Sequence, residues 1–308
     1  MKKLYKNIVL FFTPLLFILL VAPVNTRLKY QELKNDCFNH GIWIYDRIQN
    51  NSKPVDIAFL GSSQTINGIN DKLIETEMNK TGLSVVNFGY CRLGKNLIYV
   101  LLKEIVKTKH PKYVIIEIKG DEDRYSHPVF PYIADTRDVV LANPFFNRDL
   151  LGDMYLHFFY KMDLIQEKLF REAENTDIRT DDFGFASSAD TATAEVLEKY
   201  SNRCAPKPAL SKLERNFHMH FPRVYLKKIH KLCEKNRIEL YFLYIPVYCT
   251  CNQQPRELNT YTKYGKVIIP PCEIFNNPSV WHDENHLNQA GADEFSLWLS
   301  KVLMVILQ

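Results

Sequence analysis

Two adjacent hydroxyl side chains are the first candidates for chemistry in this sequence. Ser62 and Ser63 follow a short apolar run in the segment DIAFLGSSQTINGIN, just before a helix start. A serine is a poor nucleophile at neutral pH, and it needs a histidine base that a carboxylate orients. The segment WHDENHLNQAG near the C-terminus supplies both groups, because one loop carries Asp283 and His286 three residues apart. The pattern predicts a Ser–His–Asp arrangement.

Both segments also have a purely structural interpretation. Serine is a common helix N-cap, so Gly61 and the serines after it could form only a turn and a cap. Asp283 or Asn285 could cap the last helix and leave His286 at the surface. A cap requires no histidine at this spacing, however, and Leu287 would anchor the loop inward. We therefore favour the catalytic interpretation.

The elements that must position these residues alternate short apolar strands with helices. Strands are expected at 55–61, 83–89, 112–120, 238–247 and 265–270, and helices at 70–80, 94–110, 222–236 and 288–307. Such alternation implies parallel pairing with helices on both faces. The sequence predicts an α/β fold of the flavodoxin-like three-layer α/β/α type with a parallel five-stranded sheet. Ligands bind at the carboxyl ends of the strands in such sheets, where the two serines would lie.

The N-terminus predicts a membrane anchor. Lys2, Lys3 and Lys6 precede an uncharged apolar run at 8–24, and about 17 residues is the lower limit for a helix that spans a bilayer. No clear A-x-A site follows the run, so we favour an uncleaved signal-anchor over a cleaved signal peptide. The basic flank should stay in the cytoplasm, which places the rest of a single-pass protein outside the cell membrane.

Three regions are expected along the chain. The signal-anchor or transmembrane helix covers 1–27, and a polar, partly helical stalk covers 28–54. The α/β domain covers 55–308, with a long, partly helical insertion at about 121–221 in which proline, aromatic and acidic residues are mixed.

Composition and cofactor motifs exclude several classes of function. The chain has 308 residues, 46% hydrophobic and 24% charged, which suits a folded protein with a substantial core. Its net charge of +4 comes from 39 basic and 35 acidic residues, and no basic stripe interleaved with aromatics is present, so no nucleic-acid partner is expected. Neither a phosphate loop nor a dinucleotide fingerprint occurs, and no cofactor is expected.

Cysteine and histidine spacing gives little support for a metal. His218 and His220 would suit a metal only on a strand, and no third ligand is evident, so we expect no metal site. Seven cysteines leave at least one thiol outside intramolecular disulfides. Cys272 could pair with Cys249 or Cys251.

The segments GSSQ and DENHLNQAGA together resemble the SGNH/GDSL hydrolase superfamily, whose nucleophile block follows the first strand and whose D-x-x-H block supplies acid and base. The resemblance covers roughly 55–120 and 222–306. It implies Ser63 as the nucleophile, Asp283 as the orienting acid and His286 as the base. The G-S-S variant with a membrane anchor is similar to the D-alanine transfer protein type and to SGNH partners of membrane-bound O-acyltransferases.

The resemblance also implies an oxyanion hole made by the N–H groups of Ser63 and Gly89. The third block of the family, G-x-N-D, reads GDED here, with Glu122 in place of the asparagine that donates to the oxyanion. Losing one such donor typically costs about 100- to 1000-fold in rate. The alternative donors are Asn67, Asn96 and Arg124.

The resemblance implies a membrane-anchored, extracytoplasmic serine esterase or acyltransferase. Its substrate would be an acyl ester, in particular an O-acetyl group, on a cell-envelope glycan, and its partner a membrane-bound O-acyltransferase. The alternative is a non-catalytic SGNH-like binding or assembly subunit of such a system. The altered third block favours the subunit, whereas the intact serine, aspartate and histidine favour the enzyme.

Overall fold

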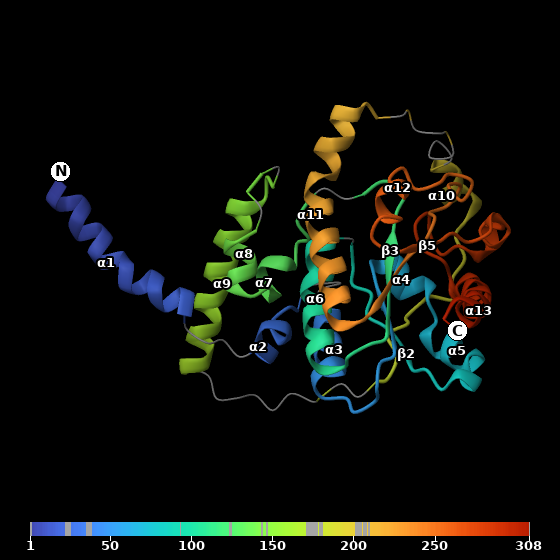
Figure 1. The fold of residues 1–308 in the computed structure, drawn as a ribbon, viewed down its shortest axis with the longest axis horizontal. Helices are drawn as coiled ribbons and strands as arrows, with labels where there is room; N and C mark the ends of the chain where they lie inside the picture. The colour runs from blue at the N-terminus through green and yellow to red at the C-terminus, as the bar shows by residue number, and fades with distance from the viewer. Residues whose placement is uncertain are drawn as a thin grey trace.

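Five parallel strands form one sheet at the centre of the protein (Figure 1). The computed structural model describes residues 2–21, 26–34, 39–92, 94–122, 125–142, 144–145, 147–170, 178, 181–200, 205, 208 and 210–307. The strands are β1 (Ile57–Leu60), β2 (Val85–Asn87), β3 (Tyr113–Ile118), β4 (Glu239–Tyr244) and β5 (Lys266–Ile268). Their order is β2-β1-β3-β4-β5, which is the order of flavodoxin-type doubly wound sheets.

Helices cover the two faces of this sheet. The longer ones in the body are α3 (His40–Gln49), α5 (Asp71–Glu77), α6 (Lys95–Thr108), α9 (Leu150–Phe170), α11 (Lys212–Asn236) and α13 (Gln289–Ile306). The shorter ones are α2 (Thr26–Gln31), α4 (Ser63–Gly68), α7 (Phe130–Ile133), α8 (Thr136–Val140), α10 (Ala194–Lys199) and α12 (Leu258–Tyr261). Single 3₁₀ turns occur at η2 (Asn79–Thr81), η4 (Cys272–Ile274) and η5 (Pro278–Val280).

The core lies on both sides of the sheet because side chains alternate along a strand. In β1, Ala58 and Leu60 pack into the apolar cluster that includes α3, α6 and α11. Ile57 and Phe59 pack into the second cluster, which includes α5 and α13. All four residues of β1 are buried, as expected for a parallel sheet with helices on both faces. The prediction of a five-stranded parallel α/β sheet is confirmed.

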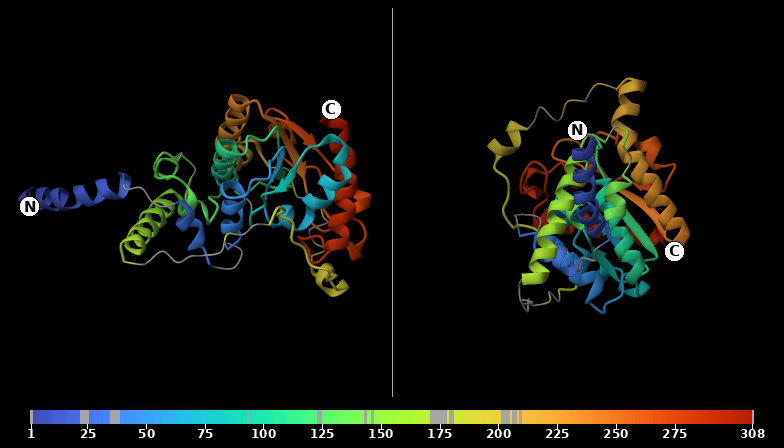
Figure 2. Two further views of the ribbon diagram at one scale, coloured as in Figure 1. Left: turned by 90° about the horizontal axis from the view of Figure 1, so that it is seen from below. Right: turned by 90° about the vertical axis from the view of Figure 1, so that its left-hand side faces the viewer.

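The insertion after β3 is mainly helical. The helices α7, α8 and α9 pack together on the side of the body from which the N-terminal helix projects (Figures 1 and 2). The helix α11 begins at Lys212, whereas the sequence predicted a start at 222. Ser211 and Glu214 form a capping box that starts the helix, and Pro222 lies inside it.

The predicted stalk is wrong for α3. Trp43, Ile44 and Ile48 of this helix are at most 1% exposed and belong to the same apolar cluster as β1. Arg47 is also buried, and its guanidinium donates to the carbonyl oxygens of Lys53 and Asp182. The sequence could not indicate that this polar segment is buried, because a contact such as that of Arg47 with Asp182 joins residues 135 positions apart.

The N-terminal helix α1 (Lys2–Val21) extends away from the body (Figure 2). Part of the predicted 1–27 anchor lies outside the described residues. Within the part of the chain that the structure describes, no helix has both the length and the apolar character needed to cross a membrane.

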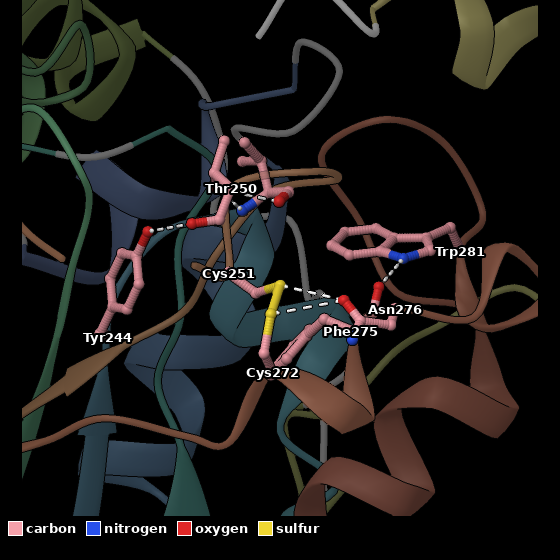
Figure 3. Close-up of a disulfide and its surroundings, with 8 residues drawn as sticks. Tyr244, Thr250, Cys251, Cys272, Phe275, Asn276 and Trp281 are labelled. Atoms are coloured by element: carbon pink, nitrogen blue, oxygen red, sulfur yellow. Dashed lines mark hydrogen bonds between the residues drawn. A yellow bond between two sulfur atoms is a disulfide. The ribbon is translucent and has the colours of Figure 1, made fainter. Parts of the chain in front are cut away.

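Disulfides brace the segment that leads to the candidate site. Cys251 and Cys272 are bonded to each other (Figure 3), which confirms one of the two pairings that the spacing allowed. Cys91 and Cys249 each belong to a further disulfide. Cys233 is a free, buried thiol, and burial raises its pKa to about 12.

Candidate active site

Ser63, His286 and Asp283 form one continuous chain of hydrogen bonds. The Oγ of Ser63 lies 2.7 Å from Nε2 of His286. On the other side of the ring, Nδ1 lies 2.8 Å from Oδ2 and 2.9 Å from Oδ1 of Asp283. A neutral imidazole that donates from Nδ1 to the carboxylate has Nε2 free to accept the hydroxyl proton of Ser63. This is the geometry that a serine nucleophile, its base and the orienting acid require.

The loop that carries the acid and the base is held by its own backbone. The N–H groups of Asn285 and His286 donate to Oδ1 of Asp283, at 2.7 and 2.9 Å. Burial acts to raise the pKa of Asp283, but the bonds from His286 and from these N–H groups outweigh it, so the pKa lies below its ordinary value. Asp283 is therefore ionised at neutral pH. The N-cap of α13 is Asn288, which leaves Asp283 and Asn285 to the loop.

The triad is open to solvent. The side chain of His286 is 23% exposed and that of Asp283 is 33% exposed, while Ser63 is half-buried. A substrate can therefore reach Ser63 without a large movement of the fold.

The second serine has a different partner. Ser62 is the N-cap of α4, and its Oγ accepts the N–H of Gln64. The same hydroxyl donates to the buried carboxylate of Glu117 at 2.7 Å, and the Ser62 N–H donates to that carboxylate at 2.7 Å. Thr65 Oγ1 donates to it as well, at 2.6 Å. The Ser62 hydroxyl therefore points into the turn, toward Glu117 and the start of α4.

Glu117 and Gly61 together shape the turn between β1 and α4. A Cβ on Gly61 would lie 2.5 Å from Oε2 of Glu117 and 1.9 Å from Oγ1 of Thr65, so only glycine allows this approach. Glu117 was missed by the sequence analysis. The signal for it was a single carboxylate inside the apolar strand KYVIIEIKG.

Gln64 connects α4, the helix that begins at Ser63, to the loop that carries His286. Its Nε2 donates to the carbonyl oxygen of Asn285 at 3.1 Å and to that of Pro246 at 3.4 Å. The side chain is buried. Ser63 and His286 therefore depend on a direct contact between α4 and the loop before α13, in addition to their own hydrogen bond.

The expected oxyanion donor Gly89 is already engaged. Its N–H donates to Oδ1 of Asn87 at 2.9 Å, so the predicted donor has a partner within the protein. Nδ2 of Asn87 donates in turn to the carbonyl oxygens of Thr65 and Ile69. A Cβ on Gly89 would lie 2.8 Å from the backbone nitrogen of Ile66. Close packing under α4 therefore accounts for a glycine at this position.

The alternative donors also have partners in the protein. Asn67 donates from Nδ2 to the carbonyl oxygen of Ala186. Asn96 is buried, and its Nδ2 donates to Oγ of Ser126 at 2.7 Å. Arg124 lies outside the described residues.

Glu122 is part of a buried ion pair. Its Oε1 lies 3.0 Å from Nζ of Lys95, and both side chains are at most 2% exposed. The hydroxyl of Tyr261 donates to the same oxygen. The carboxylate is therefore compensated by a cation on α6 and directed toward α6 and α12.

The chain after β2 brings a further cation to the same sheet edge. The N–H of Tyr90 donates to the carbonyl oxygen of Gly61 at 2.9 Å, so this segment runs beside the serine turn. Arg92 follows, is exposed, and has a φ of 63°. A bulky residue in the left-handed region is uncommon, and such strain clusters at functional sites.

A segment of the insertion lies across the candidate site. The N–H of Ala186 donates to the carbonyl oxygen of Ile66 at 3.1 Å, beside the nucleophile helix. Ser187 Oγ donates to the carbonyl oxygen of Leu287, and the N–H of Gln289 donates to that of Ser188. The segment 184–188 thus contacts both the α4 helix and the loop of the base. It includes Gly184 and Phe185 of the sequence DDFGF at 181–185.

A cavity of about 380 Å³ opens at the carboxyl ends of β3 and β4. Lys119, Tyr244 and Arg256 are among its lining residues, and Val247 lines it next to the Pro246 carbonyl that Gln64 contacts. No cluster of His, Cys, Asp and Glu suited to a metal ion occurs among the described residues. His218 and His220 lie on α11, which is a helix and not the strand that a metal pair two residues apart would need.

No family model matches the chain, and no curated protein matches it by sequence.

Proposed function

We propose that this protein is an SGNH/GDSL-type serine esterase or acyltransferase that acts on O-acyl groups of a cell-envelope polysaccharide, in particular O-acetyl groups. The observation that carries the proposal is the hydrogen-bonded chain from Ser63 through His286 to Asp283 at the carboxyl edge of the sheet. Ser63 begins a helix directly after β1, where ligands bind in doubly wound sheets.

The chemistry follows from this geometry. Nε2 of His286 takes the Ser63 proton as Oγ bonds to the acyl carbon, and Asp283 stabilises the imidazolium. The bond to the leaving alcohol then breaks, and His286 returns the proton to the alcohol oxygen, which leaves an acyl ester on Ser63. Water, or a glycan hydroxyl in a transferase, attacks this ester with His286 again as the base. Ser63 is regenerated when its oxygen takes back a proton.

When Ser63 attacks, the carbonyl oxygen of the acyl group becomes an oxyanion, which needs hydrogen-bond donors. The first N–H groups of a helix have no intrahelical partner, and Ser63 is the first residue of α4. The N–H of Gly89 already donates to Asn87. We therefore assign Arg92 as the second hydrogen-bond donor to the oxyanion. Its positive charge and the contact of the Tyr90 backbone, two residues before it, with Gly61 support that role.

The proposal places the domain outside the cytoplasmic membrane, held by α1. Exposed large apolar side chains of α1 support an anchor: Leu4, Tyr5, Val9, Leu10, Phe11, Phe12 and Phe17. The disulfides support an oxidising compartment, because structural disulfides are rare in the cytosol. A membrane-bound O-acyltransferase would then be the source of the acyl group.

A non-catalytic SGNH-like subunit is the second candidate. The engagement of the Gly89 N–H favours it, because that donor is not left to stabilise an oxyanion, and Glu122 offers no donor where the family has an asparagine. The intact triad favours the enzyme.

Labelling with a fluorophosphonate probe separates the two candidates. An enzyme should be labelled at Ser63, and Ser63→Ala and His286→Ala should both abolish the label. Ser279→Ala removes an exposed hydroxyl away from the triad and is the matched control, which should label at the wild-type rate. A wild-type protein that is folded and yet never labelled, or a Ser63→Ala variant that still supports envelope acetylation, would establish the subunit instead.

A further inference from the structure

One face of α9 exposes a row of large apolar side chains. Leu151 is 79% exposed, Tyr155 59% and Phe159 48%, and the rings of the last two pack against each other with centroids 4.3 Å apart. Residues four positions apart lie on the same face of a helix. Leu156 flanks this row and is also exposed, and the row ends at the exposed, charged Asp163. Nothing in the proposed esterase chemistry uses these residues.

The opposite face of α9 packs on the body. The buried side chains on that face are Asp153, His157, Lys161 and Leu164, and α9 contacts α7 and α8. Each residue of an α-helix turns by about 100°, so residues two positions apart point in nearly opposite directions. The row at 151, 155 and 159 is offset by two positions from the buried set at 153, 157 and 161. It therefore points away from α7 and α8, and the packing of the body does not explain it.

The helix α9 is tied to the start of the chain. It contacts α1, which extends from the side of the body where α9 lies (Figures 1 and 2). The hydroxyl of Tyr160 on α9 donates to the carbonyl oxygen of Lys29 on α2 at 2.6 Å. Four residues separate Val21, the end of α1, from Thr26, the start of α2. An extended chain spans at most about 3.6 Å per residue, so these two ends lie within about 18 Å of each other. Whatever holds the end of α1 therefore also keeps α9 nearby.

We propose that the exposed face of α9, formed by Leu151, Tyr155, Leu156 and Phe159, lies in the interfacial layer of the membrane beside α1. This inference rests on the proposed placement of α1 in the membrane. The interfacial layer is about 5 to 8 Å thick on each side of the hydrocarbon core, which is enough for one layer of side chains. Leucine and phenylalanine are the apolar residues of helices that lie in this layer. Tyrosine is enriched there because its ring is apolar and its hydroxyl stays hydrated.

A contact of this kind orients the domain. A single helical anchor leaves the domain free to rotate about the axis of that helix. A second contact through α9 fixes which face of the domain meets the membrane, and hence the position of the triad relative to the membrane surface.

Photocrosslinking of the full-length protein in phosphatidylcholine liposomes tests the proposal. A benzophenone amino acid replaces Tyr155, Phe159, Phe11 or Val305 in separate variants, and mass spectrometry identifies what each probe has bonded to after irradiation. We expect lipid adducts at 155 and 159, and at Phe11 of α1. Val305 is the matched control, because it is apolar, 73% exposed and on α13, at the end of the body opposite α1 (Figure 2). It should give no lipid adduct.

Charges placed in the row provide a second measurement. Leu151→Asp combined with Phe159→Asp should lower the yield of lipid adducts at 155 at least about tenfold, because the burial of two apolar side chains is lost. Both positions are exposed, so urea unfolding should match that of the wild type. An unchanged yield at 155 in this variant would contradict the proposal.

The position of the adducts separates this proposal from the proposed anchor. Lipid adducts at Phe11 with none at 155 and 159 overturn the contact of α9 and leave the anchor in place. No adduct at Phe11 refutes the placement of α1 in the membrane, and with it both proposals. Crosslinks from 155 or 159 to a second copy of the chain or to another protein, in place of lipid, make this face a protein interface and overturn the membrane contact.

Discussion

The substitution Glu117→Gln tests whether a buried carboxylate holds the catalytic turn. It preserves the shape of the side chain and replaces one carboxylate oxygen with an NH₂ group. Three donors now converge on Glu117: the N–H and the hydroxyl of Ser62, and the hydroxyl of Thr65, at 2.6 to 2.7 Å. An amide cannot accept from all three as strongly as a carboxylate, because it has one acceptor oxygen.

The magnitude follows from these contacts. A hydrogen bond to a charged group is worth about 1.5 to 3 kcal/mol and a neutral one about 0.5 to 1.5 kcal/mol, so the change loses about 1 kcal/mol per donor. Removing a buried charge offsets part of this loss. We expect Glu117→Gln to lower the unfolding free energy by about 2 kcal/mol. Because Ser63 follows the loosened turn directly, the rate of fluorophosphonate labelling should fall about tenfold or more.

Urea unfolding and labelling rates measure the two effects separately. Glu294→Gln, an exposed carboxylate on α13, is the matched control and should change neither. If Glu117→Gln unfolds at the same urea concentration as the wild type and labels as fast, Glu117 does not hold the turn. If stability falls and the labelling rate does not, its role is structural only.

Three further outcomes are expected. Glu122→Asn should lower the unfolding free energy in urea by about 3 to 5 kcal/mol, because it leaves Lys95 buried without its carboxylate. Unchanged stability with faster fluorophosphonate labelling would instead indicate that the Glu122 charge repels the oxyanion. Burial raises the pKa of Asp71 from 3.8 to about 6, so the folded state binds this proton more tightly than the unfolded state. Wild-type stability, measured by thermal unfolding relative to Asp71→Asn, should therefore fall as the pH rises from about 4 to about 6, and an identical pH profile in the two proteins would exclude this coupling. Replacing Cys251 and Cys272 by serine opens a loop with a sequence separation of 21 and should cost about 3 kcal/mol in thermal or urea unfolding; no loss would mean that the disulfide does not brace the fold.

Much of the fold and the three triad residues could be predicted from the sequence because their signals are local. Apolar runs bounded by glycine and polar residues predicted the five strands, and 3.6-residue periodicity predicted α6 and α13. The carboxyl ends of parallel strands meet at one edge, so the turn after β1 and the loop before α13 were expected together. The 2.7 Å contact between Ser63 and His286 agrees with that expectation.

The partners of the remaining polar groups were decided by the tertiary structure. Glu117 meets Ser62 from 55 residues away, and Glu122 meets Tyr261 from 139 residues away. Neither pairing has a periodicity or a motif that a single sequence displays. The same holds for Gly89, whose N–H direction depends on the Asn87 side chain that packs under α4.

The boundary between the predicted stalk and the folded body also depends on tertiary contacts. The sequence of α3 is mixed in polarity. Its Asp46 and Arg47 are buried, and their partners include Arg27 and Asp182, which only the folded chain brings near. A local pattern can therefore predict that Ser63 and His286 lie together, because strand ends and short loops present them. Which charges are neutralised, and which N–H groups remain available to a substrate, is decided by contacts between segments that are distant in the chain.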